Sequence, residues 1–128
     1  MGKSETDIQD RIRLEASKAG CRLWRNNVGA LLDSRGVPVR YGLANETSQQ
    51  NKLVKSADLI GIMPVKIRQE HVGMTFGVFM SIECKREGWS FRPNDKRQQA
   101  QARWAEIIRS LNGYAQMCTS WDDVILWR

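Results

Sequence analysis

The sequence predicts a small α/β domain in which a mixed central sheet is flanked by helices. Two segments, 4–19 and 94–110, carry apolar residues at helical spacing, and the segments between and after them contain short apolar runs typical of strands. The chain has 128 residues, of which 41% are hydrophobic. This is enough for one hydrophobic core without disulfides. We therefore expect a single domain over residues 1–128, with elements in the order αβββαβ.

The first helix is predicted over residues 4–19. Ser4 and Asp7 have the spacing of a capping box, and Gly20 follows the last turn. Ile8, Ile12, Ala16 and Ala19 follow helical spacing along this segment, and this stripe is expected to face inward. Glu5 lies one turn before the stripe, so its side chain is expected to face the interior or a cleft.

Strand patterns follow the first helix. Residues 21–25 alternate between apolar and polar, and residues 30–42 contain two apolar arms around a polar turn, which predicts a hairpin. Pro38 places the second arm at a sheet edge. Residues 43–56 are polar and rich in Asn, Gln and Ser, so we expect a long loop.

Two further strands are predicted in the middle of the chain. Residues 57–63 form an apolar run that ends at Pro64, and a basic loop follows. Residues 76–85 alternate most regularly, so this strand is expected to be the strongest. Glu83 and Lys85 are two residues apart on it and therefore share a face.

The second helix is predicted over residues 94–110, with Asn94 as its N-cap and Gly113 just beyond its end. The apolar runs 114–118 and 124–127 are predicted to form the last strands.

The charge indicates a polyanionic partner. Twenty Lys and Arg residues against fourteen Asp and Glu residues give a net charge of +6, and the pI is about 9.6. Residues 1–64 hold ten basic and seven acidic residues, and so do residues 65–128. An excess spread so evenly favours a basic folded surface over a basic tail, although it also fits a merely basic soluble protein.

Cysteine and histidine usage limits the possible chemistry. Cys21, Cys84 and Cys118 form no CxxC pair, and His71 is the sole histidine. A His/Cys metal site and a Ser-His-Asp triad are therefore not expected. A metal ion here would be held by carboxylates, which favours a hard ion such as Mg²⁺ or Mn²⁺.

Charged residues on the strand 76–85 need partners. The opposite face of this strand is apolar, so we expect the strand to be at least half-buried, with Glu83 and Lys85 either paired internally or binding a ligand. Asp58 begins another apolar strand. Two strand-borne carboxylates and a lysine can hold a divalent metal ion and place a water molecule beside a phosphate, whereas an internal salt bridge is the structural alternative.

Taken in order, these residues resemble the PD-(D/E)XK nuclease superfamily and, within it, the virus-type replication-repair nuclease (VRR-NUC) family. The similar stretches cover nearly the whole chain. They are Glu5-Thr6-Asp7-Ile8-Gln9, Trp24-Arg25-Asn26-Asn27, Gly36-Val37-Pro38-Val39-Arg40-Tyr41-Gly42, Ser56-Ala57-Asp58-Leu59-Ile60-Gly61, Ile82-Glu83-Cys84-Lys85, Gln101-Ala102-Arg103-Trp104 and Asn112-Gly113-Tyr114-Ala115. One departure is Ala57, where the superfamily name has proline. The resemblance implies a restriction-endonuclease-like core.

The resemblance also implies a role for each matching site residue. Asp58 and Glu83 would be the central metal ligands, joined by the backbone carbonyl of Cys84. Glu5 would bind the metal directly or through water, and Lys85 would act on the attacking water or the phosphate. The helix glutamine that positions Lys85 or the phosphate would be Gln101. Gln98, one turn earlier on nearly the same face, is the alternative.

The resemblance implies a metal-dependent DNA endonuclease, similar to small Holliday-junction resolvases that act as homodimers. A chain of this length holds one site, and a four-way junction needs two symmetric cuts, so a C2 dimer is expected. Flaps, nicked ends or duplex DNA are alternative substrates of the same chemistry. A non-catalytic DNA-binding module is the alternative from another class.

DNA contacts are expected from polar residues in loops and at element ends, mainly to phosphates. The candidates are Arg25, Asn26, Asn27, Arg35, Arg40, Lys52, Lys55, Arg86, Arg92 and Arg97. Trp89 has two possible roles, stacking on an unpaired base or packing in the core, and we favour the core.

The expected compartment is the cytoplasm, of a bacterium or of a phage-infected host. Residues 1–5 have no apolar stretch, so no secretory signal is expected, and no membrane-spanning run is present in the sequence. We expect no membrane partner and no small-molecule cofactor beyond the metal ion.

Overall fold

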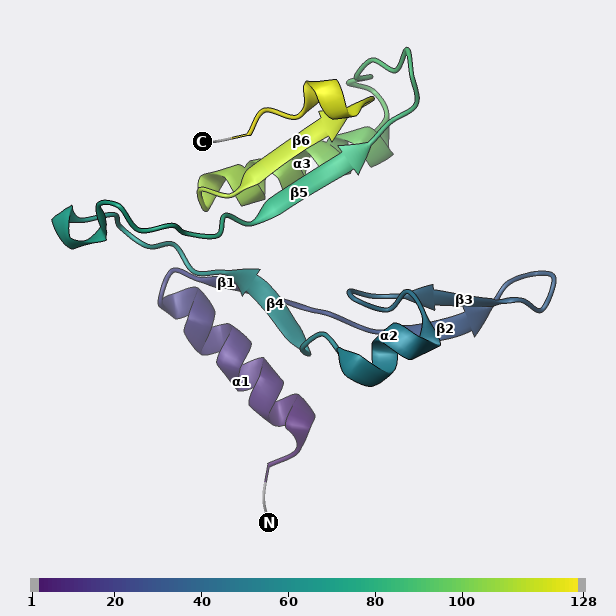
Figure 1. Cartoon of the computed structure of the whole chain (residues 1–128), viewed down its shortest axis with the longest axis horizontal. Helices are drawn as coiled ribbons and strands as arrows, with labels where there is room; N and C mark the ends of the chain where they lie inside the picture. The colour runs from purple at the N-terminus through teal and green to yellow at the C-terminus, as the bar shows by residue number, and fades with distance from the viewer. Residues whose placement is uncertain (1–2, 127–128) are drawn as a thin grey trace. The chain divides into compact units, whose positions relative to one another are not determined.

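The computed structural model describes residues 3–126 and divides the chain into two compact units, Met1–Gly61 and Ile62–Arg128, each of which is described by itself. The elements follow one another in the order shown in Figure 1. The α/β class predicted from the sequence is confirmed. Within the described residues, no helix is long and apolar enough to cross a membrane.

The first unit begins with helix α1, Glu5–Lys18, as predicted. Ile8 and Ile12 of its apolar stripe are exposed and no residue of the helix is buried, so the expected inward face is wrong. The Ser4 hydroxyl accepts a hydrogen bond from the Asp7 backbone N–H at 3.1 Å, and the Asp7 carboxylate accepts one from the Ser4 N–H at 3.4 Å. This capping box satisfies backbone donors that the first turn leaves free. Gly20, at φ +85°, lets the chain leave the helix in a left-handed conformation.

Strand β1, Arg22–Arg25, pairs with β4, Leu59–Ile62. Gly61 is the point of closest approach between these strands. A Cβ atom at this position would lie 1.8 Å from the Arg22 carbonyl oxygen, so only glycine fits without displacing the backbone. The predicted strands at 21–25 and 57–63 are both confirmed, in shorter form.

Strands β2, Gly29–Leu32, and β3, Pro38–Tyr41, form the predicted antiparallel hairpin. The Asp33 carboxylate fixes the turn because its Oδ1 accepts from the N–H groups of Arg35 and Val37, at 2.8 and 2.9 Å. These bonds and the Arg35 guanidinium lower the pKa of Asp33, with the Val37 bond the largest cause.

The segment 43–56 is not the continuous loop that was predicted. Helix α2, Ser48–Leu53, lies within it, capped by the Thr47 hydroxyl, which accepts from the Gln50 N–H at 3.0 Å. The helix was missed because its residues have no apolar periodicity, and the cap at Thr47 was the only local indication of a helix.

The second unit is built on a β-α-β arrangement. Strand β5, Met80–Cys84, pairs in parallel with β6, Tyr114–Cys118, and helix α3, Lys96–Ser110, packs on both strands (Figure 1). The predicted strand 76–85 is thus shorter than expected, because β6 offers only five pairing residues. A short 3₁₀ helix, η1, Gln69–His71, precedes β5.

Helix α3 is capped by Asp95 and not by Asn94 as predicted. The Asp95 Oδ1 accepts from the N–H groups of Arg97 and Gln98 at 2.9 and 3.1 Å, so the helix begins two residues later than expected. Ile108 of α3 is completely buried, together with Ala105 and the β6 residues Tyr114, Ala115 and Cys118. These residues are the core of the second unit.

Two predictions about strands are wrong. The described residues 124–126 form no strand, because the chain turns through a 3₁₀ helix, η2, Trp121–Asp123, held by the Asp123 carboxylate on the N–H groups of Thr119 and Ser120. Trp127 lies outside the described residues.

The described strands also form three two-stranded ladders, β1–β4, β2–β3 and β5–β6, where one central sheet was predicted. Antiparallel pairing occurs in β2–β3 and parallel pairing in β5–β6, but in separate ladders. Leaving out the 3₁₀ helices, the observed order of the described elements is αβββαββαβ, which is longer than the predicted αβββαβ.

Candidate functional site

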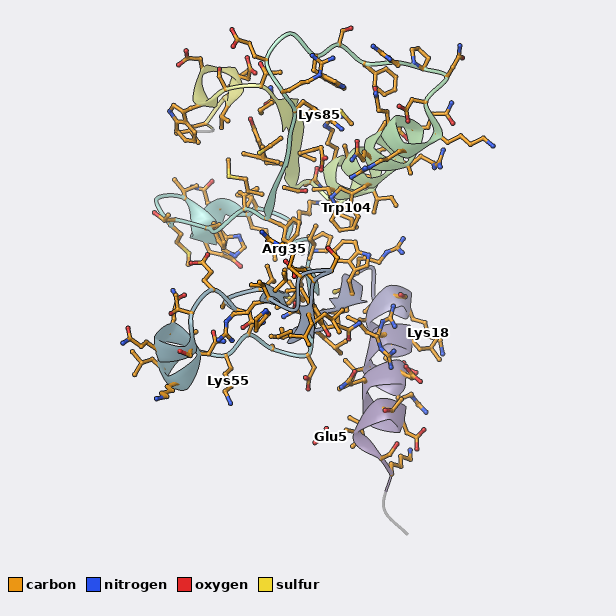
Figure 2. The ribbon with its side chains drawn as sticks, turned by 90° about the vertical axis from the view of Figure 1, so that its right-hand side faces the viewer. Glu5, Lys18, Arg35, Lys55, Lys85 and Trp104 are labelled. Carbon is orange, nitrogen blue, oxygen red and sulfur yellow. The ribbon has the colours of Figure 1, made fainter. Side chains whose placement is uncertain are left out.

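The second unit brings three of the predicted site residues into direct contact. The Lys85 Nζ donates a hydrogen bond of 2.6 Å to the Gln101 Oε1, and the Gln101 Nε2 donates one of 2.8 Å to the Glu83 Oε1. Lys85 Nζ is also 3.6 Å from the same carboxylate oxygen. The side chain of Lys85 is 15% exposed and that of Glu83 is 43% exposed. The amide of Gln101 therefore bridges a shielded cation and an accessible carboxylate (Figure 2 labels Lys85).

Strand alternation and helix spacing together produce this arrangement. Ser81 and Glu83 are two residues apart on β5 and share one face, while Gln101 and Trp104 are three apart on α3 and share another. The Trp104 Nε1 donates to the Ser81 Oγ at 2.8 Å, one step along the strand from the contact of Gln101 with Glu83. Two parallel contacts thus fix the register of the helix on the strand. Sequence reasoning missed Ser81, although its position on the Glu83 face could have indicated it.

Trp89 lies against Lys85. The Lys85 Nζ is 5.5 Å from the centroid of the Trp89 ring, within the range of a cation–π interaction. A turn in which the Trp89 N–H donates to the Arg86 carbonyl brings the indole back toward the strand end. Within the described residues, the buried Trp89 Nε1 has no hydrogen-bond partner. The structure thus gives Trp89 a packing role beside the site, and base stacking by this residue stays untested.

Gln98 has a different environment from Gln101. Its Oε1 accepts from the Arg92 N–H at 2.7 Å, and its Nε2 donates to the Asp95 Oδ2 at 3.3 Å. The residue is buried, at 9% exposure. Gln98 therefore holds the loop that leads into α3, and Gln101 is the glutamine that contacts Lys85.

Two predicted site residues lie in the first unit. Asp58 is exposed and comes directly before β4, where its backbone carbonyl accepts from the Asn26 N–H at 2.9 Å. Glu5 is the exposed first residue of α1 (labelled in Figure 2), and not a residue facing the interior as one reading of the helix stripe expected. Within residues 3–126, the carboxylates of Asp58 and Glu5 make no hydrogen bond or ion pair, so both are free to bind a ligand.

The available donors fit a hard divalent metal ion. Carboxylate oxygens and backbone carbonyls are the ligands that Mg²⁺ and Mn²⁺ prefer. Glu83 uses its Oε1 toward Gln101, and its Oε2 has no hydrogen bond to any described residue. Among residues 3–126, no group of three or more His, Cys, Asp or Glu side chains is gathered in one place.

The cysteines are thiols, and none has the geometry of a metal centre. Cys84 is exposed and is the register partner of Cys118, which is buried. Burial raises the pKa of the Cys118 thiol, with smaller contributions from Asp123 and Cys84. The backbone N–H of Lys85 donates to the Cys118 carbonyl at 2.8 Å, which anchors the end of β5 where the predicted carbonyl ligand of Cys84 lies.

A cavity of about 340 Å³ opens beside Glu83 and Gln101. Arg97 and Trp104 also line it, so a cation and an indole lie at its wall. The remaining lining is mostly small or apolar and comes from α3, β6 and Ser81 of β5. Glu83 and Gln101 are therefore accessible from this cavity.

The residues predicted to contact DNA are exposed, with one exception. Asn26 is half-buried, and its amide is used inside the first unit. Arg35 is exposed at the hairpin turn but is paired with Asp33 at 3.0 Å. The other candidates are exposed, namely Arg25, Asn27, Arg40, Lys52, Lys55, Arg86, Arg92 and Arg97.

Comparison with known proteins gives one match. A family model described as the VRR-NUC domain matches residues 3–122. No curated protein and no solved structure matches the chain.

Proposed function

Since the chain belongs to the VRR-NUC family of nuclease domains, we propose that it is an endonuclease that hydrolyses DNA phosphodiesters with the help of a divalent metal ion. The observation that carries this proposal is the bridge from Lys85 through Gln101 to Glu83. Residues 1–128 act together as one nuclease domain in this proposal.

The bridge supports this proposal through the geometry of Glu83 and Lys85. One oxygen of Glu83 is held by Gln101, so the carboxylate has a fixed orientation while its other oxygen stays available to a metal ion. Lys85 is held by a neutral amide and lies 3.6 Å from Glu83, so its charge is only partly compensated. A positioned lysine beside a carboxylate can stabilise negative charge that develops on a phosphate oxygen.

In the proposed site, Asp58, Glu83 and the Cys84 carbonyl would hold Mg²⁺ or Mn²⁺, and Glu5 would hold it directly or through water. When bound, such an ion would supply charge neutralisation for the phosphate and activation of a water molecule. Lys85 orients the attacking water or donates to the phosphate, and Gln101 keeps Lys85 and Glu83 in register. One metal ion or two are equally compatible with this donor set.

We propose a four-way DNA junction as the substrate and a homodimer as the active form. A junction requires two symmetric cuts, and one copy of this chain supplies one Glu83–Lys85 pair. The hairpin of β2 and β3 and the apolar C-terminal segment 124–127 are the surfaces proposed for the dimer. Flaps, nicked ends and duplex DNA are the alternative substrates, and a non-catalytic DNA-binding module is the alternative function.

The basic surface supports binding to DNA. The exposed Arg and Lys residues named above are proposed to contact phosphates, which positions the DNA without selecting a sequence. The protein would act in the cytoplasm of a bacterium or a phage-infected host, in DNA repair or recombination.

The test is cleavage of labelled junction, flap and duplex DNA in Mg²⁺, Mn²⁺ or EDTA. We expect paired nicks near the branch point that disappear in EDTA and in the variants Glu83→Ala and Lys85→Ala. Tight binding of DNA without metal-dependent cutting would overturn the enzyme proposal. Equal cutting of duplex DNA would overturn junction selectivity, and a monomer by light scattering in the presence of junction DNA would overturn the dimer.

A further inference from the structure

Asn26 is joined to Asp58 through the backbone. Asn26 follows directly after β1, and its N–H donates to the Asp58 carbonyl oxygen at 2.9 Å. This bond continues the pairing of β1 with β4 by one step, to the residue that precedes β4. The main chain at Asp58 is therefore held from the side of β1.

The side chain of Asn26 also binds the two residues that precede Asp58. Its Nδ2 donates to the Ser56 Oγ at 2.7 Å and to the Ala57 carbonyl at 2.9 Å. Both amide hydrogens are thus used, and three consecutive residues, 56–58, are bound to one asparagine. These bonds fix the path of residues 56–58 where the chain enters β4.

A second connection closes this network. The Asn26 Oδ1 accepts from the Leu43 N–H at 3.3 Å, and the Ser56 hydroxyl donates to the Leu43 carbonyl at 2.6 Å. The amide of Asn26 therefore has partners for its oxygen and for both hydrogens. A side chain committed in this way is poorly placed to contact DNA.

The neighbouring asparagine provides a contrast. Asn27 is exposed, whereas Asn26 is half-buried, and no described residue accepts from or donates to the Asn27 side chain. The two residues are chemically identical and adjacent in the chain, but within the described residues only the side chain of Asn26 makes hydrogen bonds.

We propose that Asn26 is a positioning residue that orients Asp58 for metal binding, and that it does not contact DNA. The inference rests on the proposed function, because it takes Asp58 as a metal ligand. When a residue that orients a metal-binding side chain through hydrogen bonds is removed, metal affinity typically falls by about 10- to 100-fold. The side chain of Asn26 acts on Asp58 only through the neighbouring Ser56 and Ala57, so we expect an effect at the lower end of this range.

The experiment compares Asn26→Ala with Asn27→Ala. Binding of Mn²⁺ to the whole chain is measured by calorimetry, binding of junction DNA is measured in EDTA, and folding is followed by thermal unfolding. For Asn26→Ala we expect Mn²⁺ affinity to fall about tenfold while DNA affinity in EDTA is unchanged. For Asn27→Ala we expect unchanged Mn²⁺ affinity. A loss of DNA affinity in Asn26→Ala with normal Mn²⁺ binding would overturn the inference.

Two further variants separate the possible failures. Ser56→Ala removes one of the bonds to Asn26 and leaves Asn26 in place. A smaller loss of Mn²⁺ affinity is expected for this variant, and it can be measured even if Asn26→Ala does not fold. Normal Mn²⁺ binding in a folded Ser56→Ala would count against the inference.

Asp58→Ala reports on the proposed function itself. If Asp58→Ala binds Mn²⁺ normally, Asp58 is not a ligand and the proposed site fails. If Asp58→Ala loses Mn²⁺ and Asn26→Ala does not, only the inference about Asn26 fails.

Discussion

Gln101 accepts a hydrogen bond from Lys85 at 2.6 Å and at the same time donates one to Glu83 at 2.8 Å. A primary amide can do both because it carries an acceptor and two donors on one rigid plane. Neither a carboxylate nor an ammonium at position 101 could make both contacts. The neutral bridge therefore holds two opposite charges in fixed geometry without neutralising either.

Removal of the bridge should slow the chemistry more than it weakens DNA binding. In Gln101→Leu, Lys85 and Glu83 keep their charges but lose their common partner, so we expect kcat to fall by about 10- to 100-fold with KM for DNA little changed. Steady-state cleavage of junction DNA measures both parameters. An unchanged kcat would show that Lys85 and Glu83 need no amide between them.

Gln98→Ala is the matched control for this variant. Gln98 supports the entry to α3 through Arg92 and Asp95 and has no contact with Lys85. Loss of these contacts should lower the free energy of unfolding by about 1 kcal/mol per hydrogen bond and leave kcat unaltered below the melting temperature. Thermal unfolding and cleavage rates of the same preparation separate the two effects. A fall in kcat without a fall in stability would make Gln98 the functional glutamine.

The Trp89 ring should matter more than its indole N–H. The ring faces the Lys85 ammonium at 5.5 Å, while the Nε1 has no partner in the described part of the chain. Trp89→Phe retains an aromatic face, so we expect near-normal turnover. Trp89→Leu removes the cation–π contact, which contributes about 0.5 to 2 kcal/mol, and we expect lower kcat with unchanged DNA affinity.

Binding of DNA in EDTA distinguishes this role of Trp89 from base stacking. If Trp89 stacked on an unpaired base, Trp89→Leu would lose affinity for junction DNA without any metal ion present. The loss would be about 1 to 3 kcal/mol. Unchanged affinity together with slower cleavage is the result that the Lys85 contact predicts.

Local sequence chemistry explains what could be predicted of the fold. The capping box of Ser4 and Asp7 and the turn around Asp33 both act within four residues, so α1 and the β2–β3 hairpin could be read from the sequence. The length of β5 could not, because it depends on the five residues of β6, which are some thirty positions later in the chain.

In the site too, local sequence patterns predict some features, whereas others depend on residues far apart in the chain. The alternation of the predicted strand 76–85 put Glu83 and Lys85 on one face, but Gln98 and Gln101 are both reasonable choices from helix spacing alone. The register of α3 on β5, fixed by Trp104 and Ser81, decides between them. Asn26 and Asn27 are likewise equivalent in the sequence, and the path of residues 43 and 56–58 makes them different.

The cap of α3 should make stability depend on acid pH. The backbone N–H of Gln98 is the largest cause that lowers the pKa of Asp95, with further contributions from Arg97, the Gln98 side chain and Lys85. A carboxyl whose pKa is lower in the folded state stabilises the protein above its unfolded pKa, near 3.8, and loses this effect as the pH falls through the folded value.

Asp95→Asn tests this dependence, because asparagine still caps a helix but does not titrate near this pH. We expect the wild type to melt at a higher temperature than the variant at neutral pH, and the difference to shrink as the pH falls below 3.8. Melting temperatures across this range provide the measurement. A difference that stays constant with pH would mean that the charge of Asp95 contributes nothing to the cap.

Gly61→Ala should disrupt the pairing that positions Asp58. A Cβ atom at residue 61 would lie 1.8 Å from the Arg22 carbonyl oxygen and 2.8 Å from the Leu23 Cα, and both contacts are with backbone that cannot rotate away. We expect the free energy of unfolding to fall by about 3 kcal/mol or more.

Gly20→Ala is the comparison, because a Cβ atom at this position would meet nothing within 4 Å. This variant should lose only the free energy of the backbone strain at φ +85°, about 1 to 2 kcal/mol. If the two variants lose equal stability, the close approach of β1 and β4 is not what fixes residue 61 as glycine. Gly61→Ala could instead be the less stable variant and also bind Mn²⁺ more weakly below its melting temperature. In that case the pairing of β1 with β4 helps to position Asp58, in addition to the hydrogen bonds from Asn26.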